Sequence, residues 1–172
     1  MAVYLRDLPI ADPDLNLTSR SSNLRAYAAL PEIALLAWPE AVVEQFLFDH
    51  CDNDSFRHDY ESLDFSTLHW AKTSVETKNL LNILTGPSDQ RFLESVAANH
   101  THWLTVRPIA IQEAWKEQGT WLVPPILIAR ETLSPGATGL QVIEGRMRIG
   151  ILQGRAKEGL RVADTHEAWI AQ

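Results

Sequence analysis

The stretch Leu140-Gln-Val-Ile-Glu-Gly-Arg-Met-Arg-Ile-Gly-Ile-Leu-Gln-Gly-Arg-Ala-Lys157 is the part of the chain from which the fold is most directly inferred. It begins with β-branched side chains, Val142 and Ile143, which are typical of a strand. Glu144 and Gly145 then form a turn, and the apolar residues after the turn have helical spacing. The stretch therefore predicts a strand, a glycine turn and a helix.

The turn between this strand and this helix predicts an anion-binding site. The first N–H groups of a helix lack partners within the helix, and the helix dipole favours negative charge there. Gly145 allows a close backbone approach or a positive φ. Arg146 and Arg148 can form charge-assisted hydrogen bonds to phosphate or carboxylate. The alternative is that both arginines are solvated or pair with acids of the N-terminal half, which contributes roughly 0–1 kcal/mol per exposed pair.

The run Glu144-Gly145-Arg146-Met147-Arg148 resembles the Gly-x-x-Arg box of the ParB/sulfiredoxin superfamily. The order of the preceding elements agrees, with a helix at Ile109–Gln118 that ends at Gly119 and a strand at Pro124–Ile128. The resemblance covers residues 103–172. Within the box itself, only the glycine and the last arginine match the family strictly.

The resemblance implies a nucleotide- or phosphate-binding protein, with hydrolysis, phosphotransfer or nuclease activity as the possible chemistries. ATP or CTP with Mg²⁺ would be the ligand, and Gly145, Arg146 and Arg148 would contact its phosphates. Glu144 and Arg148 would be the catalytic residues, and Glu144 would also hold the metal. The sulfiredoxin cysteine would fall at Arg146, so sulfinic-acid reduction is not expected. The DNA-binding domain of ParB follows the box, whereas this chain ends at Gln172, so sequence-specific DNA binding is not expected either.

The predicted fold class is α+β, with a small mixed sheet of ParB/sulfiredoxin-like type. Residues 1–100 are expected to form a mostly helical extension, and residues 101–172 the sheet domain on which the extension packs, giving one compact body. Within the extension, the apolar spacing between Thr73 and Leu84 predicts a helix. After the expected boundary, Trp103–Val106 is interpreted as a strand that Pro108 ends.

The charge is unevenly distributed along the chain. The net charge is −7, and residues 1–100 account for −8 while residues 101–172 account for +1. An acidic protein is a poor candidate for non-specific nucleic-acid binding and a better one for binding a basic protein. The alternative function is therefore a non-catalytic protein-binding module, such as an immunity protein that neutralises a toxin, or an inhibitor, with a degenerate box.

Other features of the sequence predict the cellular location and indicate further candidate sites. A single cysteine, Cys51, and the absence of an apolar run of about 18 residues or of a signal peptide predict a cytoplasmic protein without a membrane span. The dense polar run 49–59 suggests a metal site or, more simply, a capped helix end. His100 and His102 would share one face of a strand, as a catalytic pair or as two ordinary polar residues.

Overall fold

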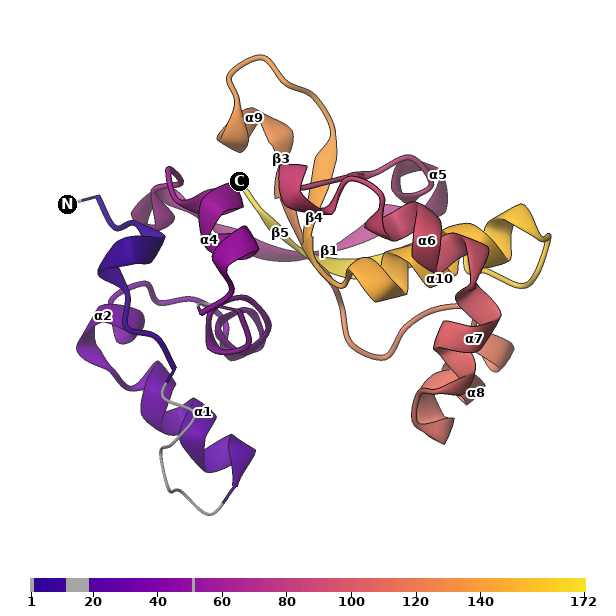
Figure 1. The fold of residues 1–172 in the computed structure, drawn as a ribbon, viewed down its shortest axis with the longest axis horizontal. Helices are drawn as coiled ribbons and strands as arrows, with labels where there is room; N and C mark the ends of the chain where they lie inside the picture. Colours follow the sequence, from indigo (N-terminus) through magenta and orange to yellow (C-terminus); the bar gives the residue numbers. More distant parts are fainter. Residues whose placement is uncertain (1, 12–18, 51) are drawn as a thin grey trace. The chain divides into compact units, whose positions relative to one another are not determined.

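The computed structural model describes residues 2–11, 19–50 and 52–172, and it has an α+β fold with a five-stranded mixed sheet (Figure 1). Cys51 lies outside the described residues. The chain divides into two compact units, residues 1–70 with Gln172 (the helical unit) and residues 71–171 (the sheet unit). The expected packing of a helical extension on the sheet domain stays a prediction, and each unit is described by itself.

The helical unit is built from short helices around an aromatic core. The described helices are η1 (Leu5–Asp7), α1 (Arg20–Ala28), α2 (Pro31–Ala34), α3 (Glu40–Val42), the π-helical η2 (Val43–Phe48), α4 (Asp54–Tyr60) and η3 (Phe65–Thr67). Phe46 is fully buried, and its ring centroid lies 5.6 Å from that of Trp38 and 4.9 Å from that of Phe56. Burial of such large rings is the main stabilising contribution available to a unit of this size.

The sheet unit alternates helices with the five strands. In chain order the elements are β1 (Trp70–Glu76), α5 (Thr77–Leu80), β2 (Leu84–Thr85), η4 (Pro87–Asp89), α6 (Phe92–Ala98), α7 (His100–Thr105), α8 (Ile109–Glu117), β3 (Ile126–Ala129), α9 (Arg130–Leu133), β4 (Leu140–Glu144), α10 (Arg146–Lys157) and β5 (Thr165–Ala171). The strand order is β1-β5-β3-β4-β2. β4 pairs antiparallel with β3 and parallel with β2, and β3 pairs parallel with β5.

The core of the sheet unit lies around β3, β4 and α10. The side chains of Ile126, Leu127 and Ile128 are fully buried in β3, as a strand covered on both faces requires. From α10, Ile149 and Leu152 enter the same core, which confirms the predicted helix after the glycine turn. α10 also packs closely against α6, where a Cβ at Gly150 would clash with the side chain of Val96.

Two predictions of local structure were wrong. Residues 103–106 belong to or follow helix α7, since the N–H of Trp103 donates to the carbonyl of Asn99 in helical fashion. The segment 73–84 holds the end of β1, the single turn α5 and the start of β2 instead of one helix. The helix begins only at Thr77, whose N–H donates to the carbonyl of Asp164, 2.9 Å away, next to β5, instead of to a preceding helical turn.

The unit boundary reflects these strands. It lies between Trp70 and Ala71, whereas the sequence analysis places a boundary at residue 100. β1 and β2 are the two outer strands of the sheet, and α6 covers α10, so residues 71–100 belong with the sheet. The sheet unit therefore begins about 30 residues before the expected boundary at residue 100, with β1 as its first strand.

Candidate functional site

The turn between β4 and α10 has the geometry predicted for Gly145. Its φ is +93°, in the left-handed region, and it is the N-cap residue of α10. A Cβ atom at this position would lie only 2.4 Å from the Cβ of Pro125, so glycine is required for space as well as for conformation. The residue brings the turn against the segment that leads into β3.

Glu144 and Arg148 form an ion pair across this turn. A terminal nitrogen of Arg148 donates to Oε2 of Glu144, one helical turn away. The other terminal nitrogen donates to the carbonyl of Val123 at 2.7 Å. Both side chains are about four-fifths buried. Burial lowers the pKa of the Arg148 guanidinium, and the negative charge of Glu144 opposes that shift. Both charged groups of the pair are therefore largely shielded from water.

Arg146 faces a different neighbour. It forms an ion pair with Asp89, the last residue of η4, and its guanidinium lies over the ring of Phe92 at 5.7 Å from the centroid. The structure therefore does not bring Arg146 and Arg148 to one point, since each guanidinium is directed to its own carboxylate. The acids are Glu144 and Asp89, one on each side of the start of α10.

Arg107 is a basic residue that the sequence analysis did not select. It lies between α7 and α8, where its carbonyl accepts a hydrogen bond of 2.7 Å from Gln112. Its guanidinium is near enough to Arg148 to lower the pKa of Arg148 further. In the described part of the chain no carboxylate forms an ion pair with Arg107. No sequence signal links the two arginines, because only the tertiary fold brings them together.

The arginines leave an excess of positive charge on one side of the α10 start. Arg148 is paired there with Glu144 at the positive end of a twelve-residue helix, and Arg107 adds a second positive charge that acts on Arg148. The arrangement fits an anion. It does not fit a magnesium ion, because Glu144 already accepts from a guanidinium and a cation placed beside it would be repelled. Within the described ranges, no cluster of three or more His, Cys, Asp or Glu residues could hold a metal.

The histidines of the sheet unit are separate from this turn. His100 is buried in α7, with Nε2 3.1 Å from Oε2 of Glu158 but not aligned for a hydrogen bond, and His102 is exposed. The two do not share a strand face, because the segment is helical. His166 is buried in β5 while Glu167 is exposed and pairs with Lys72, as alternation along a strand predicts.

His166 lies in a closed hydrogen-bond network. Its Nδ1 is 2.7 Å from the hydroxyl of Thr120, and its Nε2 is 3.0 Å from that of Thr77. The Thr77 hydroxyl donates to the carbonyl of Ala163, so it accepts from Nε2–H, which assigns the neutral tautomer. Burial lowers the pKa of His166 to about 4. This side chain is a neutral structural residue at neutral pH.

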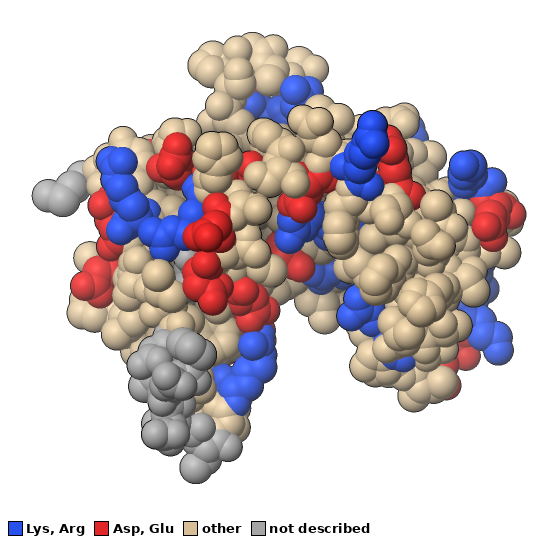
Figure 2. All heavy atoms as spheres, viewed as in Figure 1, with Lys and Arg blue, Asp and Glu red and all other residues tan. Residues whose placement is uncertain are grey.

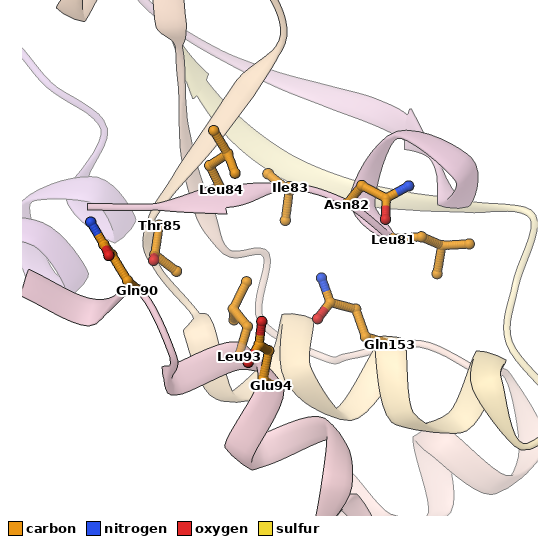
Figure 3. A pocket seen from close by; sticks show the side chains of 9 residues that line it. All are labelled: Leu81, Asn82, Ile83, Leu84, Thr85, Gln90, Leu93, Glu94 and Gln153. Atoms are coloured by element: carbon orange, nitrogen blue, oxygen red, sulfur yellow. The ribbon is translucent and has the colours of Figure 1, made fainter. Parts of the chain in front are cut away.

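A groove runs beside α10, between the segment 81–85 and helices α6 and α10 (Figure 3). Its first cavity has a volume of about 530 Å³, and a second one of about 420 Å³ adjoins it towards Lys157. In Figure 3 the side chains of Leu93, Glu94 and Gln153 project from the two helices towards the segment 81–85. The lining is made of aliphatic, amide and hydroxyl side chains, with Glu94 as the one ionisable group of the first cavity.

The surface of the sheet unit carries mixed charge. On the face drawn in Figure 2, blue and red side chains lie next to one another over this unit, instead of forming a patch of one sign. The face therefore lacks the continuous basic stripe that accompanies binding along a nucleic-acid backbone. No described helix is both long enough and apolar enough to cross a membrane.

Comparison of the chain with protein-family models, curated proteins and solved structures gives no match. The resemblance to the ParB/sulfiredoxin superfamily accordingly rests on the box at residues 144–148 and on the order of elements around it.

Proposed function

We propose that the protein binds a phosphate-bearing ligand, with a nucleotide such as ATP or CTP as the leading candidate, at the start of α10. The observation that carries this proposal is the first turn of the twelve-residue helix α10, where Arg148 is paired with Glu144 and where the charge of Arg107 also acts on Arg148. A phosphate placed there would meet two guanidinium groups and the helix dipole. It would also relieve the repulsion between the two arginines.

Each side chain has a distinct role in this proposal. Arg107 binds the ligand directly, because it has no partner of opposite charge among the described residues. Arg148 adds a second positive charge while it holds Glu144 and the carbonyl of Val123 in place. Gly145 allows the turn to approach closely. Glu144 acts as the counter-ion of Arg148 and not as a metal ligand or a general base, so the proposal is for binding rather than for hydrolysis or transfer.

The first test is a calorimetric titration of the protein with ATP and with CTP, each with and without Mg²⁺. Micromolar binding is expected, and Arg107→Ala should weaken it by about tenfold or more, the effect of losing one charge-assisted contact. Binding should not require Mg²⁺, because the site offers no free carboxylate to the metal. Arg161→Ala is the matched control, since it removes an exposed arginine beyond the far end of the same helix.

Two results would overturn the proposal. One is the absence of binding to either nucleotide and to inorganic phosphate. The other is binding that survives Arg107→Ala unchanged, which would place the ligand elsewhere. Arg107→Ala is preferred to Arg148→Ala as the deciding variant, because Arg148 also supports the fold and its loss would affect stability.

A non-catalytic protein-binding role, such as toxin neutralisation or inhibition, is the second candidate. The observation that favours it is the groove beside α10, which is lined mainly by aliphatic and amide side chains and whose one lining hydroxyl, that of Thr85, already donates to the carbonyl of Asp89. The acidic net charge of −7 agrees with a basic partner. A groove of this kind serves recognition better than catalysis.

A further inference from the structure

The outer strand β1 offers an edge to which a further strand can be added. β1 is first in the strand order and β5 is its one neighbour, so its second edge faces no other strand in the described part of the chain. It has seven residues, Trp70–Glu76, whereas β2 at the other end of the order has two. The backbone N–H and C=O groups along an outer strand of this length can pair with a strand of another chain.

The middle of β1 is exposed on both faces of the sheet. Successive side chains of a strand point to opposite faces, and all four residues of the range 71–74 are exposed. Val75 enters the core, so the face that it shares with Thr73 is covered only near the end of the strand. Proteins usually cover or disrupt a long outer strand, because it pairs readily with other chains. The uncovered edge of β1 is therefore a candidate interface.

The charged residues of β1 select the partner. Lys72 and Glu76 lie four residues apart on one face of the strand, with Ser74 midway between them. A lysine on an outer strand opposes pairing with a strand that has no acid across from it. A second copy of β1 supplies that acid. When the two copies run antiparallel about a two-fold axis between their Ser74 residues, Lys72 of each lies opposite Glu76 of the other.

The other residues of the strand suit the same register. Thr73 of one copy lies opposite Val75 of the other, and the two Ser74 residues lie opposite each other. Pairs of β-branched or hydroxyl side chains are favourable in such positions. The net charge does not prevent the contact, because residues 71–171 hold 11 Lys or Arg and 10 Asp or Glu, a net charge of +1. Repulsion between two sheet units is therefore small.

The ion pairs within the single chain leave both charged residues available. Lys72 pairs with Glu167 at 2.7 Å, and Glu76 pairs with Lys78 at 2.6 Å. The four side chains are between 43% and 74% exposed. Pairs this exposed contribute only about 0–1 kcal/mol, so they can exchange for pairs with a second copy at little cost.

We propose that two copies of this chain associate through β1, antiparallel and centred on Ser74, so that one continuous sheet crosses the interface. The contact involves residues 72–76 of each copy. An interface of this size is small, and the dissociation constant of the dimer should be on the order of 10–100 µM. This inference goes beyond the proposed function, because β1 contributes no residue to the anion site at the start of α10.

The test is sedimentation equilibrium of the full chain between about 1 and 500 µM. The average mass should rise with concentration from 19.4 kDa towards twice that value. Lys72→Glu places acid opposite acid at both ends of the interface, and Glu76→Lys places lysine opposite lysine. Each variant alone should self-associate about tenfold more weakly or worse. An equal mixture of the two should associate again, because every lysine then faces an acid of the other variant.

The controls separate this register from general effects of charge. Glu113→Lys and Lys116→Glu make the same charge changes at exposed positions of α8 and should self-associate like the unchanged protein. The double variant Lys72→Glu with Glu76→Lys restores every opposite pair and should do so too, which decides the proposal even where a single change disturbs the fold. A mass of 19.4 kDa at all concentrations, full self-association of both single β1 variants, or a monomeric double variant would overturn the proposal.

Discussion

Arg148 connects the β4–α10 turn to the segment before β3, through Glu144 on one side and the carbonyl of Val123 on the other. Replacing it by alanine removes one donor from the mostly buried carboxylate of Glu144 and one from the carbonyl of Val123. Arg148→Ala should therefore lower the free energy of unfolding by about 2–4 kcal/mol, as loss of one partner of a buried pair does. Urea denaturation followed by circular dichroism measures this change. Arg161→Ala should change it by less than about 0.5 kcal/mol, and an equally small effect of Arg148→Ala would contradict the structural role.

His166 makes stability depend on pH, because its burial favours the neutral ring in the folded state. Its pKa of about 4 lies below the unfolded value of about 6.5, so its contribution is complete above pH 6.5 and is lost as the pH falls towards 4. Lowering the pH from 7 to 5 should therefore reduce the free energy of unfolding by about 2 kcal/mol, because the unfolded chain takes up a proton at His166 more readily than the folded one. Denaturation curves at both pH values, for the unchanged protein and for His166→Gln, isolate that contribution. An unchanged pH dependence in the variant would show that His166 is not its source.

At the scale of elements, the position of α10 depends on its close contact with α6 and α7. Gly154 makes this contact possible, since a Cβ there would lie 2.4 Å from the carbonyl oxygen of Ala97 and 2.7 Å from the Cβ of His100. Backbone cannot move aside easily, so Gly154→Ala should destabilise the protein by about 1–3 kcal/mol despite the better helix propensity of alanine. Thermal and urea unfolding measure the loss. Lys157→Ala, an exposed change on the same helix, should be close to neutral, and a stabilised Gly154→Ala would refute the tight packing.

At the scale of the whole molecule, charge limits the range of partners. With a net charge of −7, the chain repels a polyanion such as DNA. Dissolved salt screens this repulsion and so shortens its range. We expect no electrophoretic shift of duplex DNA at protein concentrations below about 10 µM in low salt, where non-specific binders already associate. A basic DNA-binding protein serves as the positive control. A salt-sensitive, sequence-dependent shift would show that a local surface overrides the net charge.

The features that the sequence alone predicted correctly are those set by short-range rules. The α+β class and the helix after the glycine turn follow from apolar periodicity within each segment. The left-handed φ of Gly145 follows from its place between a strand and a helix, because glycine adopts that conformation with the least strain. Each of these requires information from only a few neighbouring residues.

Tertiary structure alone decided the features that depend on distant residues. Short apolar runs fit a strand or a helix about equally, so β1 and α7 were settled by tertiary pairing and packing; directly after β1, for example, the N–H of Thr77 donates to the carbonyl of Asp164. The partners of the arginines were likewise undetermined, since Arg146 pairs with an aspartate 57 positions away. The effect of Arg107 on the pKa of Arg148 likewise joins two residues that are 41 positions apart in the sequence. The strength of a charge interaction depends on distance in space and on burial, neither of which a linear pattern specifies.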